Sequence, residues 1–180
     1  MVRVTLLVLV LLSLLGCHSS PKKLVIDDGP TLPTAVAGAS DPFIIKMQNK
    51  LAKQGVRVIT MGQMYLVSIP TPLLFADQSP ELKWSSYNLL NEIVCYLQQF
   101  RKITVHINAY SSCYLSEQRT HALTLARSRI IANYLWSQTI ETRMVFTQGM
   151  GNNKPIVAFS KCTDSSPNSR IEIIFRRAVA

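Results

Sequence analysis

Hydrophobic and polar positions alternate along residues 103–109, and this alternation is typical of a strand with one buried face. The apolar positions expected on that face are Ile103, Val105, Ile107 and Ala109. Polar residues dominate the ten positions that follow, which indicates a loop at the end of the strand. The pattern therefore predicts a half-buried strand that leads directly into a polar loop.

A helix is predicted beyond this loop, because apolar side chains return with the spacing of one helical face. The residues that define the face are Leu123, Ala126, Ile130 and Tyr134. Ser116 is suited to cap the helix, since its hydroxyl can accept a hydrogen bond from an unpaired first-turn amide. Strand, loop and helix together form the central unit of the chain.

One arginine lies within the apolar stripe of the predicted helix. Arg127 comes one turn after Leu123 and one turn before Ile131. An unpaired buried charge is strongly unfavourable, so Arg127 needs a carboxylate, a set of carbonyls or an anionic ligand. Arg129 lies about 200° away around the helix and is expected to be solvated. Arg127 is thus the leading candidate for a functional contact.

The residues before the central unit predict a short helix, a hairpin and a longer helix. Residues 43–51 fit an amphipathic helix, and residues 56–70 fit two strands divided at Gly62. A serine, a proline and a glutamate at positions 79–81 have the signals of a helix start. The buried face of that helix is expected to consist of Tyr87, Leu90, Val94 and Leu97.

Two further strands are predicted after the central unit, over residues 143–148 and 171–175. A glycine-rich turn at residues 149–151 and a polar loop at residues 161–169 lie between them. Strands that alternate with helices favour parallel pairing through right-handed crossovers. The expected fold class is therefore α/β (α+β).

Three ordered motifs resemble the OmpA-like C-terminal domain, the peptidoglycan-associating module of outer-membrane proteins and lipoproteins. Residues 123–127 (LTLAR) are similar to the family's Leu-x-x-x-Arg helix motif, and residues 168–172 (NSRIE) to its Asn/Asp-x-Arg-x-Glu motif. Residues 73–82 (LLFADQSPEL) resemble the segment before the family's first long helix. The resemblance covers roughly residues 60–176. It implies a β-α-β-α-β sandwich of a mixed sheet with helices on one face, after the short helix and the hairpin.

The family's strand motif, Gly-His/Tyr-Thr/Ala-Asp, is altered in this chain. Its aspartate falls on Tyr110, or on Ser111 if the register moves by one residue. The resemblance implies that the aspartate and the helix arginine hold the amine and carboxylate of a stem-peptide diamino acid. Without the aspartate, the ammonium would fall to Tyr110, Glu117 or Asp164. The resemblance implies these candidate peptidoglycan-binding residues: Arg127, Tyr110, Ser111, Leu123 and Arg170.

The start of the chain has the features of a lipoprotein signal peptide over residues 1–16. Arg3 precedes an apolar run that is too short to span a bilayer comfortably. The run ends in LLGC, which resembles a bacterial lipobox, so Cys17 is expected to be cleaved free and acylated. His18 follows where an aspartate would favour inner-membrane retention, which favours the periplasmic face of the outer membrane.

A tether and a single domain are expected after the lipidation site. Residues 17–42 are rich in Pro, Ser, Gly and Ala, a composition typical of a flexible linker. Residues 24–26 form an apolar island within it, suited to docking a partner or to contacting the chain's own domain. Residues 43–180 are long enough to form one domain with its own core.

The formal net charge is +9, so an exported domain of this kind fits anionic wall polymers, lipid headgroups or an acidic protein. A dispersed positive surface that serves solubility is an equally good explanation. Nucleic acid is not a predicted partner, because no recognised binding motif accompanies the charge. No cofactor is expected, and the scattered histidines and cysteines do not have metal-site spacing.

Three cysteines besides Cys17 are expected in an oxidising compartment. Cys113 follows the central strand and Cys162 precedes the last one, so both are expected at the same edge of the sheet. A disulfide between Cys113 and Cys162 is therefore predicted. Cys95 falls among polar residues of its helix and fits either a free thiol or an intermolecular link.

Two functions fit these observations, and they are compatible with each other. The first is a lipid-anchored protein that links an envelope assembly to peptidoglycan. The second is a purely structural subunit that has lost the wall site and makes protein contacts, as in lipoproteins of type IV secretion systems, which this domain organisation resembles. An enzyme is not predicted, because no nucleophile and base pattern is visible.

Overall fold

The computed structural model describes residues 41–112, 116–140, 142–158 and 163–178. The predicted signal peptide, Cys17 and most of the tether lie outside these residues, as do Cys113 and Cys162. Within the described part of the chain, no helix is long and apolar enough to cross a membrane. The same part holds no group of three histidine, cysteine or acidic side chains placed to bind a metal ion.

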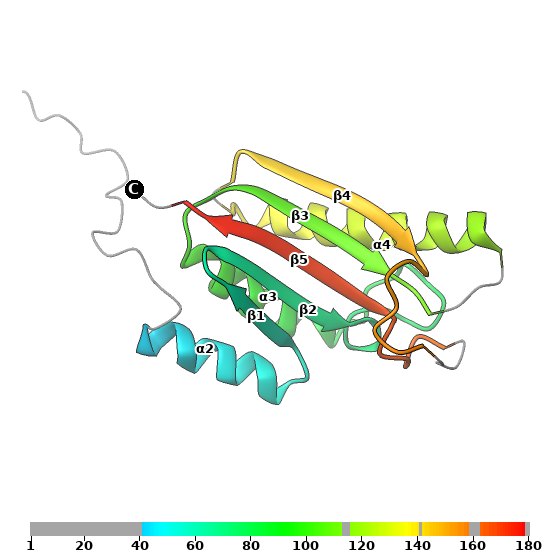
Figure 1. Ribbon diagram of the computed structural model, residues 1–180, viewed down its shortest axis with the longest axis horizontal. Helices are drawn as coiled ribbons and strands as arrows, with labels where there is room; N and C mark the ends of the chain where they lie inside the picture. The colour runs from blue at the N-terminus through cyan, green and yellow to red at the C-terminus, as the bar shows by residue number, and fades with distance from the viewer. Residues whose placement is uncertain (1–40, 113–115, 141, 159–162, 179–180) are drawn as a thin grey trace, which may run out of the picture. The chain divides into compact units, whose positions relative to one another are not determined.

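Five strands form one mixed sheet in the order β1-β2-β5-β3-β4 (Figure 1). β3 and β4 are parallel, whereas β5 is antiparallel to both of its neighbours, β2 and β3. The last strand in sequence order therefore lies in the middle of the sheet. The bounds of the strands are β1 Arg57–Met61, β2 Met64–Pro70, β3 Lys102–Tyr110, β4 Met144–Gly151 and β5 Arg170–Arg177.

Figure 1 shows two helices, α3 and α4, on one face of the sheet, which confirms the expected fold class. The helices are α2 (Pro42–Lys53), α3 (Ser86–Gln98) and α4 (Glu117–Ser137), and a short 3-10 helix, η1, covers Thr71–Leu73. The predicted cap of α4 is confirmed, because Ser116 Oγ accepts a hydrogen bond of 3.2 Å from the Arg119 amide. The predicted hairpin is also confirmed, since β1 and β2 pair as antiparallel neighbours.

The core lies between the sheet and these helices. Paired residues of the three central strands form rows on the buried face, such as Val67, Ile173 and Ile107. All three are 0% exposed, which is why the alternation in β3 could be recognised from sequence. Complete burial of aliphatic side chains of this size contributes about 1.5–3 kcal/mol each.

The predicted start of α3 at residues 79–81 is wrong, because the helix begins at Ser86. Ser79 Oγ does accept a hydrogen bond from the Glu81 amide, so the local cap signal is used in a turn. The backbone then pairs with the preceding segment through an isolated bridge between Phe75 and Leu82. These tertiary contacts outweigh the local preference for a helix, and Tyr87 is consequently 37% exposed rather than buried.

The start of β3 also differs from the prediction. Ile103 is 52% exposed, whereas Lys102 is only 5% exposed. The pairing of β3 with β5 changes register between Lys102 and Val105, so the alternation does not extend to the first residues of the strand. The Lys102 ammonium donates to the carbonyls of Leu97 and Phe100 at 2.7 and 3.2 Å, which satisfies the buried charge with the end of α3.

Residues 149–151 form the end of β4 rather than the predicted glycine-rich turn. A Cβ at Gly149 would lie 2.4 Å from the Leu125 amide nitrogen and 2.7 Å from the His121 carbonyl oxygen. Only glycine allows the backbone of α4 to approach β4 this closely. The glycine therefore fixes the position of α4, which carries Arg127, against the edge of the sheet.

Candidate functional site

Arg127 is fully buried at 0% exposure and is paired with an acid from another part of the chain. Its Nη1 and Nη2 atoms donate to Asp164 Oδ1 and Oδ2 at 3.0 and 2.7 Å. Its Nε donates to the Ser79 carbonyl at 3.0 Å, and its guanidinium lies 5.4 Å from the centre of the Phe75 ring. The prediction that Arg127 lies in the buried stripe and needs a partner is confirmed.

Asp164 is held from a second side by the backbone before α3. The Gln78 amide donates to Asp164 Oδ2 at 2.8 Å, and Gln78 has a positive φ of 50° that aims this amide. Burial alone would raise the pKa of Asp164, but hydrogen bonds from Arg127 and Gln78 and the charge of Arg127 lower the pKa below its ordinary value. Asp164 is therefore an ionised carboxylate that accepts two parallel hydrogen bonds from the planar guanidinium of Arg127.

Tyr110 occupies the end of β3, where the motif aspartate was expected, and is 3% exposed. The guanidinium of Arg170 lies over its ring at 3.9 Å from the centre. Arg170 Nε also donates to Glu172 Oε1 at 2.7 Å, and Glu172 is itself 9% exposed. Burial, followed by the charge and hydrogen bond of Glu172, raises the pKa of Tyr110. Tyr110 thus remains neutral and packs against an arginine that already has a carboxylate partner.

Small polar residues join the two loops at this edge of the sheet. The Ser111 amide donates to the Gly151 carbonyl at 2.7 Å, and Ser111 is buried. Ser112 Oγ donates to the Thr163 carbonyl at 2.6 Å, and the Ser112 amide donates to Ser169 Oγ at 2.9 Å. These bonds connect the residue that precedes Cys113 with the residue that follows Cys162.

The buried face of α4 differs in detail from the predicted one. Leu123 and the other predicted face residues are half-buried, so Leu123 lies beside Arg127 rather than deep in the core. The fully buried side is instead polar toward the start of the helix, with Thr120, Thr124, Arg127 and Ser128 followed by Ile131, Ala132 and Leu135. Arg129 is exposed, as expected, and so are His106 and His121.

The structure brings Arg127, Tyr110, Ser111 and Arg170 to the same end of the sheet, where β3 ends and β5 begins. Sequence reasoning missed the pairing of Arg170 with Glu172, although residues two apart in a strand share a face and this pattern was visible. It also missed the Ser79 carbonyl as a partner of Arg127, for which the sequence holds no signal. The resemblance offered Asp164 as a partner for a ligand ammonium, and the structure pairs it with Arg127 instead.

Comparison with known proteins places these residues in a family. The sequence matches the OmpA family over residues 74–169, which is more than half of the chain. It is 26% identical over 128 residues to a probable lipoprotein, YiaD, of Escherichia coli strain K12, covering 71% of this chain and 58% of YiaD. It is 27% identical over 103 residues to the peptidoglycan-binding protein ArfA of Mycobacterium bovis, covering 57% of this chain and 32% of ArfA.

Solved structures show the same fold at low sequence identity. The cell wall anchor of the type VI secretion system from Pseudomonas aeruginosa has a TM-score of 0.64 at 21% identity, covering 75% of this chain and 97% of that chain. The periplasmic domain of Helicobacter pylori MotB has a TM-score of 0.57 at 19% identity, covering 69% of this chain and 83% of that chain. The fold agrees with the family match over residues 74–169, and that match shows that the chain belongs to the OmpA family.

Proposed function

We propose that this chain is a lipid-anchored envelope protein whose OmpA-family domain attaches an envelope assembly to peptidoglycan. One observation carries the proposal: Arg127 donates two parallel hydrogen bonds to a carboxylate at the end of the sheet where the family motifs meet. The carboxylate of a stem peptide can be bound through the same pair of hydrogen bonds. The names of two relatives, a probable lipoprotein and a peptidoglycan-binding protein, support this direction.

Asp164 now occupies the position that a wall carboxylate would take. A diamino acid carries both a carboxylate and an ammonium. When it binds, Arg127 and Asp164 can therefore give up their contact with each other and each take the oppositely charged group of the ligand. The ligand carboxylate would then bind Arg127, and Asp164 would receive the ammonium. This exchange replaces the family's missing aspartate with an acid from the loop before β5. Ser111 and Leu123 would border the ligand, and Tyr110 with Arg170 would support the strand end beneath it.

A sacculus pull-down with matched variants tests this mechanism. Arg127→Ala should reduce wall association several-fold, since a hydrogen bond to a charged group contributes about 1.5–3 kcal/mol. Asp164→Asn keeps the shape of the side chain and removes the charge that the ammonium needs, so it should also weaken association. Arg129→Ala removes an exposed charge from the same helix and should have little effect. Unchanged association in the first two variants would contradict the wall function.

A second candidate is a structural subunit in which this edge makes no ligand contact. The complete burial of Arg127 and the pairing of Arg170 with Glu172 favour it, because both guanidinium groups already have a carboxylate. In that case Arg127→Ala and Asp164→Asn should lower the unfolding temperature and leave wall association unaltered. Measuring both quantities on the same variants separates the two functions.

Lipid anchoring at Cys17 on the periplasmic face of the outer membrane is part of the proposal. Its support is the LLGC sequence and the His18 that follows it. Cys17→Ser should leave the precursor uncleaved or release the protein from the membrane. Normal processing and normal fractionation of that variant with the outer membrane would contradict the anchor.

The assembly proposed as the partner is a secretion apparatus of the type IV class or another envelope complex. The support is the resemblance of the domain organisation to lipoproteins of that class, together with the fold shared with a secretion-system wall anchor from Pseudomonas aeruginosa. Crosslinking in intact cells, followed by purification and identification of the attached proteins, tests it. Recovery of peptidoglycan alone, without an envelope protein, would contradict this part of the proposal.

A further inference from the structure

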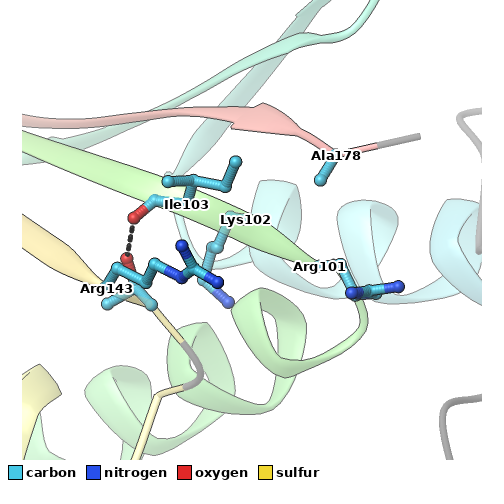
Figure 2. Close-up of a pocket in the computed structure, with 6 residues that line it drawn as sticks. Arg101, Lys102, Ile103, Arg143 and Ala178 are labelled. Atoms are coloured by element: carbon cyan, nitrogen blue, oxygen red, sulfur yellow. Dashed lines mark hydrogen bonds between the residues drawn. The ribbon is translucent and has the colours of Figure 1, made fainter. Parts of the chain in front are cut away.

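A basic pocket lies at the opposite end of the sheet from Arg127, where β3 and β4 begin (Figure 2). Its volume is about 380 Å³, and its lining comprises Arg101, Lys102, Ile103, Thr142, Arg143 and Ala178. Backbone bonds fix its rim, because the Arg143 amide donates to the Ile103 carbonyl at 3.0 Å and the Ala178 amide to the Arg101 carbonyl at 2.8 Å. The positions of the two arginines are thus set by the sheet itself.

The charge of this pocket is positive and open to solvent. Arg101 and Arg143 are exposed, and within the described residues no carboxylate forms an ion pair with either. Lys102 adds a buried charge beneath them, while its ammonium donates to backbone carbonyls of the chain. Glu141, the acid nearest in sequence, lies outside the described residues. Two guanidinium groups at a concave surface, with no ion pair among the described residues, favour a phosphate, which each can bind bidentately.

The pocket shares its end of the domain with the start of α2. This helix runs antiparallel to α3, because Gln54 contacts Glu92 while Gln48 contacts Tyr96, nearer the end of α3. Figure 1 accordingly shows the start of α2 at the same end of the sheet as the start of β3. Phe43 and Ile45, in the first turn of α2, are 56% and 42% exposed. Exposed apolar groups at the same end of a domain as a basic pocket are typical of a surface that meets a membrane.

We propose that this pocket binds the phosphate of an anionic phospholipid headgroup and orients the domain on the membrane. The inference rests on the lipid anchor proposed above, since that anchor precedes α2 in the chain. The tether expected from the sequence of residues 17–42 would keep the pocket at a high effective concentration near the bilayer, so weak headgroup contacts suffice. The end of the sheet that holds Arg127, where β3 ends, then faces away from the membrane toward the wall.

Hydrogen exchange of the full-length protein in vesicles tests the proposal. The protein, extracted in detergent, is reconstituted into vesicles of phosphatidylcholine, with or without phosphatidylglycerol. Exchange at the amides of Ile103 and Arg143 should slow about five-fold with phosphatidylglycerol, the effect of roughly one basic contact. High salt should remove this protection. Arg101→Gln with Arg143→Gln should abolish it, whereas Arg119→Gln with Arg129→Gln, an equal charge change on α4, should preserve it.

Each other outcome has a defined meaning. Equal exchange in the two kinds of vesicle, or equal loss of protection in both double variants, would overturn the proposal that this pocket binds the headgroup. Protection by soluble glycerol phosphate in phosphatidylcholine vesicles, at the level seen with phosphatidylglycerol, would overturn the lipid as the source of the phosphate. Failure of the protein to float with phosphatidylcholine vesicles would instead overturn the anchor. The pocket is then judged by adding phosphatidylglycerol vesicles to the unanchored protein.

Discussion

Arginine side chains differ in burial and pairing between the two ends of the sheet. Where β3 ends, Arg127 and Arg170 are buried and each is paired with a carboxylate. Where β3 begins, Arg101 and Arg143 are exposed and have no ion pair within the described residues. The difference follows from the connections, because the long segment between β4 and β5 supplies Asp164 to the first end, whereas short connections bound the second. Arginine side chains therefore form internal ion pairs where β3 ends, which we call the paired end. Where β3 begins, which we call the open end, they remain available to external partners.

Removal of Arg127 should be the largest perturbation of the paired end. Arg127→Ala leaves Asp164 buried without its partner, and breaking a buried pair in this way costs about 3–5 kcal/mol of unfolding free energy. Urea unfolding of the wild type and the variant measures the effect. Arg129→Ala is the matched control and should change stability by less than about 0.5 kcal/mol. Similar small losses in both variants would mean that the pair contributes little to stability.

A disulfide between Cys113 and Cys162 should add a covalent link to the paired end. Neither cysteine is among the described residues, but the bond from Ser112 to Thr163 joins their neighbours and supports the prediction. Closing a loop of this length should contribute about 4 kcal/mol in the chain-entropy model. Unfolding with and without reductant, in a Cys95→Ser background, measures it. Peptide mapping under non-reducing conditions that recovers both as free thiols would refute the link.

The paired end should also make stability depend on pH. The folded-state pKa of Asp164 is lowered below its ordinary value near 3.8, so the unfolded chain binds a proton more readily than the folded one. The stabilisation from this carboxylate is therefore fully present above that value and is lost as the pH falls through the folded-state pKa. Unfolding measured across acidic pH should show this loss in the wild type. Asp164→Asn should show less of it, and an identical pH profile would contradict the assignment.

The open end should tolerate loss of charge with the smallest effect on folding. Arg101→Gln and Arg143→Gln remove exposed charges without a described partner, so each should change the unfolding free energy by no more than about 0.5 kcal/mol. Thermal unfolding of each variant in vesicle-free solution checks this. A loss comparable with that of Arg127→Ala would show that the two ends do not differ as the geometry indicates.

The parts of this fold that sequence could predict are those determined by neighbouring residues. The alternation in β3 and the Ser116 cap are local, and the burial of Arg127 followed from its place in a helical stripe. The start of α3 could not be predicted, because a contact between Phe75 and Leu82 replaces the helix that the local signals favour.

At the candidate site, the sequence indicated Arg127 but left open whether its partner is a carboxylate, a set of carbonyls or a ligand. Asp164 is 37 residues away from Arg127, and only the folded chain decides which loop reaches the guanidinium. Gly149 was assigned to a turn because the close approach of α4 is a tertiary contact that composition does not record. Non-local contacts thus account for the main errors in both the fold and the site.

The central place of β5 has a consequence for the order in which the domain folds. β5 pairs with β2 and β3 on its two sides, so neither half of the core can be sealed before residues 170–177 are available. β2 pairs locally with β1, but it must wait for its second partner about a hundred residues later in the chain, and pairings of such long range are intrinsically slow to form. The sheet consequently stays incomplete until almost the whole chain is available. Completion of the fold is therefore a late, concerted event, during which exposed strands require protection from aggregation.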